Sequence, residues 1–209
     1  MSYRGKAMPS QTYYNLPKEK QERIMQATIH EMGTHTFENL NIANIIRASK
    51  ISRGSFYQYF SDKYDLYTYF YQYIAQRKIE FFGDLFKIEH DIPFLERFLQ
   101  LYISGFKFGT QNPEIVKAAK KVLDSDYLLA SNQMADSMKQ GVEIFASFIK
   151  RDQELGRIRK TIDPLLLAAF LLEFSNKMTL EEYFKYEADP SIIENKIRQL
   201  IEMLQKGIE

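Results

Sequence analysis

The sequence contains no cysteine among its 209 residues, which excludes disulfide bonds, thiolate metal sites and cysteine nucleophiles. It also has no apolar run near the roughly 18 residues that a membrane-spanning helix needs. The polar N-terminus lacks the pattern of a signal peptide. We therefore expect a cytoplasmic protein that does not enter a membrane.

Residue patterns that catalysis or metal binding would require are also missing. The three histidines, His30, His35 and His90, form no pair at the spacing of a helical metal site. There is no glycine-rich phosphate loop and no nucleophile elbow. Paired carboxylates such as Glu181 and Glu182 are typical of a solvated helix surface. We expect no metal, no cofactor and no enzymatic activity.

Net charge is only +1, but it is distributed unevenly. Residues 1–63 hold nine Lys or Arg against five Asp or Glu, a balance of +4. The totals of 28 and 27 leave 19 against 22 for the remainder, a balance of −3. A modest basic excess in the first third is compatible with a nucleic-acid-binding surface there.

Residues 51–63 carry the main functional hypothesis. Ser52 is a favourable N-cap, because its hydroxyl can accept a hydrogen bond from a free backbone N–H of the first turn. Phe56 and Phe60 are four residues apart, so a helix would place both on one buried face. The spacing predicts a short helix after Ser52.

The other face of this helix would show small and polar groups. Gly54, Ser55 and Gln58 point away from the two phenylalanines, with Tyr57 and Tyr59 on the flanks. Small residues allow a close backbone approach, an amide can hydrogen-bond a base edge, and tyrosine hydroxyls can bind phosphates. The face suits insertion into a DNA groove, although an ordinary amphipathic surface helix has the same periodicity.

A second short helix precedes this one. Residues 41–48 have a possible cap at Asn41 and place Ile42, Ile45 and Ile46 on one face. Only three or four residues then lead to the next helix, as a helix-turn-helix requires.

Residues 18–66 resemble the DNA-binding domain of the TetR family of transcriptional regulators. The matching positions are Gly33 after the first helix, Asn41-Ile42 and Ile45-Ile46 in the second, and Gly54, Tyr57, Phe60, Lys63 and Leu66 in the last. The chain departs from the family pattern at Ser49-Lys50, where Ala-Gly is usual. Glycine adopts the left-handed backbone conformation freely, whereas a lysine in that conformation costs roughly 1 kcal/mol.

The pattern and the resemblance together predict a set of DNA-contacting residues. They are Asn41, Ser52, Arg53, Gly54, Ser55, Tyr57, Gln58, Tyr59 and Lys63.

Helical periodicity and helix-breaking residues continue to the end of the chain, so the expected fold is all-α. We expect helices over 17–32, 62–82, 93–108, 113–123 and 126–152, and two more that open with Asp163-Pro164 and Asp189-Pro190. Three parts are predicted. They are a flexible N-terminal arm over 1–16, a helix-turn-helix head over 17–62, and a helical ligand-binding and dimerisation domain over 63–209. The arm is either a disordered tail or a segment that enters a minor groove.

Residues 165–172 are apolar on every side of their helix, and the last helix has an apolar stripe that includes Ile197 and Leu204. A monomer of this size covers one face of each helix, so the remainder suggests a partner subunit. In the family the resemblance implies, these two helices form a four-helix dimer interface. A two-fold dimer would bind a roughly palindromic operator.

The resemblance also implies that the C-terminal helices enclose a small-molecule effector site. Bulky aromatic and methionine side chains could line an adaptable apolar pocket, or could simply be core. The candidate lining residues are Phe98, Tyr102, Phe106, Met134, Met138, Phe145, Phe174 and Asn176. Asn176 and Glu173 are candidate polar anchors, or else lie at the dimer seam or in solvent. Such a pocket would favour a large apolar or aromatic ligand.

We therefore expect a homodimeric, sequence-specific DNA-binding regulator, a repressor that such an effector releases from double-stranded DNA. The alternative is a helical ligand-binding or protein-interaction module that does not read DNA.

Overall fold

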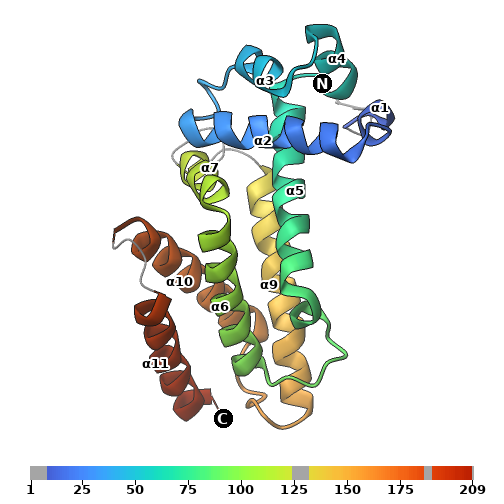
Figure 1. Cartoon of the computed structure of the whole chain (residues 1–209). Helices are drawn as coiled ribbons and strands as arrows, with labels where there is room; N and C mark the ends of the chain where they lie inside the picture. Colours follow the sequence, from blue (N-terminus) through green and yellow to red (C-terminus); the bar gives the residue numbers. More distant parts are fainter. Residues whose placement is uncertain (1–8, 124–131, 186–189, 209) are drawn as a thin grey trace. The chain divides into compact units, whose positions relative to one another are not determined.

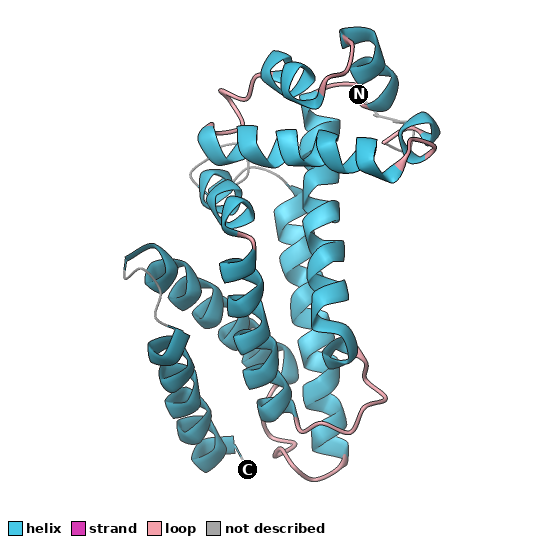
Figure 2. Ribbon diagram, in the orientation of Figure 1, coloured by secondary structure: helices cyan, strands magenta, loops and turns pink. Residues whose placement is uncertain are grey.

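The computed structural model describes residues 9–123, 132–185 and 190–208, and every regular element within these ranges is helical (Figures 1 and 2). The elements are α1 (Gln11–Tyr14), α2 (Lys18–Thr34), α3 (Ile42–Ser49), α4 (Arg53–Tyr59), α5 (Lys63–Phe82), η1 (Gly83–Phe86), α6 (Phe94–Gln111), α7 (Pro113–Leu123), α9 (Asn132–Glu154), α10 (Pro164–Lys185) and α11 (Pro190–Ile208). The predicted all-α class with a helix-turn-helix head is confirmed.

Two compact units make up the chain. Unit 1 comprises residues 1–78 and 112–130, and unit 2 comprises residues 79–111 and 131–209. The predicted domain boundary after residue 62 differs from this division, because residues 63–78 of α5 and the whole of α7 pack with the head. The long helix α5 therefore contributes to both units.

In unit 1, α2 crosses the head and packs against both α3 and α7 (Figure 1). Gly33 was predicted to end this helix, but α2 continues to Thr34 and Gly33 is not in the left-handed region. A Cβ atom at Gly33 would lie 3.4 Å from Lys117 Cβ and 3.6 Å from the backbone N of Ala118. The glycine therefore permits the close approach of α7 rather than a helix end.

Residues 9–16 also differ from the expected flexible arm, because they pack on the head. Tyr13 in α1 has no exposed surface, and its ring lies against Phe60 and Tyr69. Gln21 donates from Nε2 to the carbonyl of Leu16 at 2.8 Å. The buried ring and the hydrogen bonds of Ser10 and Gln21 together anchor this short segment, and sequence periodicity does not report such contacts. Residues 1–8 of the predicted arm lie outside the described part.

The helix-turn-helix forms with both of its predicted caps. Asn41 Oδ1 accepts from Ala43 N at 2.9 Å, and Ser52 Oγ accepts from Ser55 N at 3.0 Å. Lys50 ends α3 with φ 54° and ψ 45°, the left-handed conformation that glycine would adopt without strain. The lysine therefore carries the backbone cost that its position in the turn predicts.

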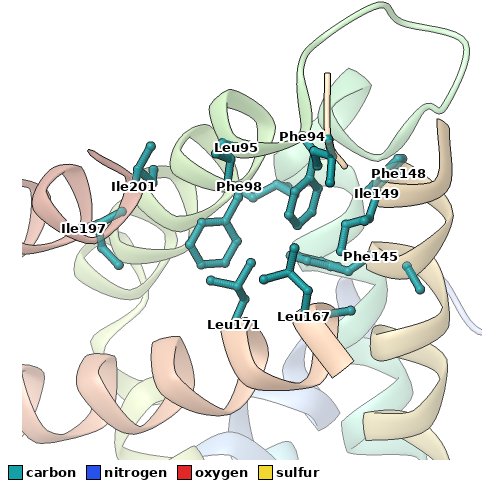
Figure 3. Close-up of a cluster of buried hydrophobic side chains, with 14 residues drawn as sticks. Phe94, Leu95, Phe98, Phe145, Phe148, Ile149, Leu167, Leu171, Ile197 and Ile201 are labelled. Atoms are coloured by element: carbon teal, nitrogen blue, oxygen red, sulfur yellow. The ribbon is translucent and has the colours of Figure 1, made fainter. Parts of the chain in front are cut away.

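In unit 2, α6, α9, α10 and α11 enclose an apolar core in which phenylalanine rings pack among more numerous aliphatic side chains (Figure 3). Phe94, Phe98 and Ile149 are at most 2% exposed, and Leu171 and Ile197 reach them from α10 and α11. Gly156 follows the end of α9 and has a left-handed backbone with φ 74°. Asp163 caps α10 by accepting a hydrogen bond from Leu165 N at 2.8 Å, as the sequence predicted.

Charged side chains hold the loop between α5 and α6. Asp152 is buried on α9 and accepts from Phe94 N, the first residue of α6, at 2.6 Å. Arg97 is 1% exposed and donates to the carbonyls of Leu85 and His90, both at 2.6 Å. Its guanidinium lies 4.4 Å from the ring centroid of Phe148. These contacts fix residues 83–93, in which η1 is the regular element, through side-chain hydrogen bonds.

None of the helices in the described ranges is long and apolar enough to cross a membrane.

Replacing Lys50 by glycine is expected to raise the free energy of unfolding by about 1 kcal/mol, because glycine adopts the same left-handed conformation without strain. Lys50→Ala is the matched control, since it removes the charge but keeps the Cβ atom. Urea unfolding followed by circular dichroism measures both variants. An equal gain for Lys50→Ala would attribute the effect to charge and contradict the backbone explanation.

Candidate nucleic-acid interface

Helix α4 has a buried inner face and an open outer face. Phe56 and Phe60 are fully buried, and Phe60 packs against Tyr13 and Tyr69 with centroid distances of 5.2 and 5.9 Å. Arg53 and Gln58 are exposed on the outer face. A helix of seven residues is not stable alone, so its phenylalanines attach it to the head while its outer side chains remain available.

Gly54 lies on this outer face, where the head itself does not require a glycine. Its φ is not positive, and a Cβ atom built there would meet only Ser52 Oγ, at 3.9 Å. An alanine would favour the helix by up to about 1 kcal/mol. Among the described residues, no neighbour requires this position to be small, and the absence of a side chain leaves the backbone there open to a close approach.

A surface hollow of about 420 Å³ lies where α3 meets α4. Its lining combines asparagine amides, aliphatic groups and one cation: Asn39, Leu40, Asn41, Ile42, Ala43, Ile46, Arg53 and Tyr57. Tyr57 is 45% exposed, and the Arg53 guanidinium lies 5.8 Å from its ring centroid. The hollow offers hydrogen-bonding and cationic groups to one ligand, as base edges and phosphates require. Sequence reasoning missed Asn39, since it lies in a loop with no periodic signal.

The structure brings together Arg53, Gly54, Tyr57 and Gln58, and it gives Asn41, Ser52 and Ser55 capping contacts. Ser52 Oγ lies 2.9 Å from Ser55 Oγ, so the two hydroxyls pair at the start of α4. Asn41 uses its side chain to cap α3. All three residues remain at the surface or half-buried beside the hollow.

A buried carboxylate holds α3 in place beneath this surface. Glu31 is 5% exposed and accepts from Asn41 N at 3.0 Å and from Asn44 Nδ2 at 3.2 Å. Asn44 Oδ1 in turn accepts from Arg47 Nη2 at 2.8 Å. Glu31 therefore sets the start of α3 from within α2, a role that its position in the helix pattern did not reveal.

Tyr59, which the sequence predicted on a flank of α4 and among the DNA contacts, is buried. Its side chain is 3% exposed, and its ring lies 6.0 Å from that of Tyr13. Helical geometry placed Tyr59 on a flank of α4, and that flank is the one that α1 covers. We therefore remove Tyr59 from the candidate DNA contacts.

Lys63 also differs from the expected free cation. Its Nζ donates to the carbonyls of Phe37 and Glu38 at 3.2 and 3.3 Å and lies 4.5 Å from the Phe37 ring centroid. These bonds fix the loop before α3 to the start of α5. In this structure Lys63 supports the head rather than presenting a charge to a ligand.

The candidate effector residues that the structure describes include buried, half-buried and exposed side chains. Phe98 and Phe145 are core residues in mutual contact, with ring centroids 6.2 Å apart, and Phe106 is buried. Tyr102 and Met138 are half-buried. Phe174, 39% exposed, stacks on Phe170 at 6.1 Å on the outer side of α10. It is therefore wrongly placed in a lining. The side chains of Met134 and Asn176 lie outside the described residues.

Within the described residues, no group of three or more His, Asp or Glu side chains is arranged to hold a metal ion.

Comparison by sequence supports a nucleic-acid interface at this head. Residues 24–69 match the family model described as bacterial regulatory proteins, tetR family. These residues include α3, the turn, α4 and the start of α5. A comparison with curated proteins found no match.

Comparison by structure extends the likeness to the helices of both units. A TetR family transcriptional regulator from Chloroflexus aurantiacus is 23% identical, covering 97% of this chain and 99% of its own, with a TM-score of 0.66. The fatty acid degradation regulator FadR from Bacillus halodurans is 15% identical, covering 90% and 96%, with a TM-score of 0.75. FadR from Bacillus subtilis in complex with stearoyl-CoA is 14% identical, covering 86% and 96%, with a TM-score of 0.75. At these identities the likeness shows the fold.

Proposed function

We propose that this chain, a member of the TetR family of transcriptional regulators, is a cytoplasmic homodimeric repressor that an apolar effector releases from its operator. The observation that carries the DNA-reading part is the outer face of α4. On that face Arg53, Tyr57 and Gln58 are exposed near Gly54, where the described residues of the head leave room for a larger side chain.

Each group on this face has a role that its chemistry suits. Gln58 offers an amide that can form two hydrogen bonds with an adenine edge. Arg53 offers a cation beside the Tyr57 ring, and the Tyr57 hydroxyl is free to donate to a phosphate. Gly54 lets the start of α4 enter the groove without a side chain between backbone and DNA.

Gly54→Ala is expected to weaken DNA binding by about 1–3 kcal/mol, the usual cost of a methyl group forced into a filled space. It should at the same time preserve or raise thermal stability, because alanine favours a helix. Fluorescence anisotropy with a duplex selected from a random library by the wild-type protein measures the dissociation constant.

Gly207→Ala is the control, since that glycine lies in α11 with open space around it. Binding by Gly54→Ala as tight as by the wild type would contradict insertion of α4 into DNA.

The second part of the proposal is a dimer through α10 and α11. Leu166, Phe170 and Phe174 recur every four residues along α10 and are 70%, 49% and 39% exposed. On the adjacent face of the same helix, Leu167 and Leu171 are buried in the core. A helix that is apolar on both sides needs a second covering surface. On α11, Ile192 and Met203 are also exposed.

We expect the wild type to sediment at twice 24.7 kDa at micromolar concentration. Leu166→Glu should favour the monomer by at least about 3 kcal/mol, because the dimer would bury an unpaired charge in each subunit. Ile144→Glu is the matched control, since Ile144 is an exposed apolar residue on α9. A wild-type monomer that remains folded would remove both the interface and the palindromic operator.

The third part concerns the effector. FadR from Bacillus subtilis forms a complex with stearoyl-CoA, which shows that a protein of this fold can take an acyl ligand. In this chain Phe98, Tyr102 and Phe145 form an aromatic core with ring contacts of 6.2 and 6.4 Å. An effector has to part these rings, and only a large apolar or aromatic molecule compensates for the contacts that are lost.

Acyl compounds and large neutral aromatic compounds should raise the melting temperature and release DNA, whereas sugars and nucleotides should do neither. Thermal-shift and anisotropy titrations on the same samples measure both effects. Phe174→Ala should keep the response, because Phe174 lies on the exposed side of α10. Stabilisation by sugars alone would contradict the apolar site.

A further inference from the structure

Helix α4 ends without a cap of its own. Its last turn contains no basic residue, and the residue after it, Phe60, has an extended backbone at φ −132° rather than a left-handed one. Phe60 N bonds to the carbonyl of Phe56, at 2.9 Å. The last carbonyls of a helix need partners from elsewhere, and here those of Gln58 and Tyr59 need them.

Ser10 supplies both partners from a distant part of the sequence. Its hydroxyl donates to the carbonyl of Gln58 at 2.6 Å, and its backbone N–H donates to the carbonyl of Tyr59 at 3.0 Å. Ser10 and Gln58 are 48 positions apart along the chain. Ser10 thus serves as a C-terminal cap for α4, at the residue whose side chain is offered to the bases.

The segment that carries Ser10 is itself fixed. Tyr13 is fully buried, and its ring contacts Tyr59, Phe60 and Tyr69 with centroid distances between 5.2 and 6.0 Å. Burial raises the pKa of the Tyr13 hydroxyl above its ordinary value, so the ring stays neutral there. Gln21 in α2 also donates to the carbonyls of Tyr14 and Leu16 at 3.1 and 2.8 Å.

We propose that Ser10 is a positioning residue for base reading, which holds the backbone at Gln58 so that its amide meets the base edge in one orientation. This inference rests on the proposed DNA-reading function. Bidentate recognition of a base depends on the direction of the amide as well as its presence. Loosening the last turn should therefore reduce discrimination between bases more than it reduces affinity for DNA in general.

The experiment uses the full chain and compares two kinds of duplex. One is the duplex that the wild type selects from a random library, and the others carry single base-pair substitutions in it. Ser10→Ala removes the hydroxyl, Ser10→Thr retains it, and Gln11→Ala is a control in the same segment. Gln11 bonds only within the segment, from its Nε2 to Asn15 Oδ1 at 3.1 Å.

Ser10→Ala should lose about threefold to tenfold in discrimination, the range expected from one hydrogen bond, at the positions where Gln58→Ala also loses it. Added to Gln58→Ala, it should cause no further loss. Ser10→Thr should restore discrimination and Gln11→Ala should leave it unchanged. Melting curves of each variant should show that the fold is intact.

Unchanged discrimination in Ser10→Ala, or an equal loss on every duplex, would overturn the positioning role and leave the DNA-reading function standing. A wild type that selects no sequence from the library would overturn the DNA-reading function, and this inference with it.

Discussion

The head depends on the attachment of α4 through its buried phenylalanines. Seven residues are too few to form a stable helix alone in water. The helix forms because Phe56 and Phe60 are fully buried, and because the ring of Phe60 packs against those of Tyr13 and Tyr69. Because one face of α4 makes the packing contacts, the opposite face is not needed to hold the helix in place. That separation explains why Gly54 and Gln58 are exposed, and why Tyr59, on the covered flank, is buried.

Polar contacts across the sequence then set the orientation of the two short helices. Glu31 binds the start of α3 from within α2, and Ser10 binds the end of α4 from the N-terminal segment. Lys63 fastens the preceding loop through two carbonyls. Each contact satisfies a backbone group that a short helix or loop leaves without a partner, and each partner comes from outside that helix or loop.

Unit 2 presents a different problem, because its apolar surface exceeds what its own core can bury. Phe98, Phe145 and Leu171 are enclosed, whereas Leu166 and Phe170 on the same α10 are exposed. Under the proposed function, an effector has to open the enclosed set, and the exposed set is where a partner subunit would pack. A ligand can act on DNA affinity only by favouring one of two arrangements, so packing of both surfaces bears on the proposed regulation.

The sequence by itself determined the longer helices and the caps at Asn41 and Ser52, because these follow from local backbone chemistry, but it did not reveal α1. It also determined which residues of α4 are buried together, apart from Tyr59. Tertiary structure decided the rest. The packing of Tyr13, the approach of α7 to Gly33, and the bonds of Ser10 to α4 join positions far apart along the chain. Periodicity reports which side of a helix is apolar, and only the packed fold decides which neighbour covers it.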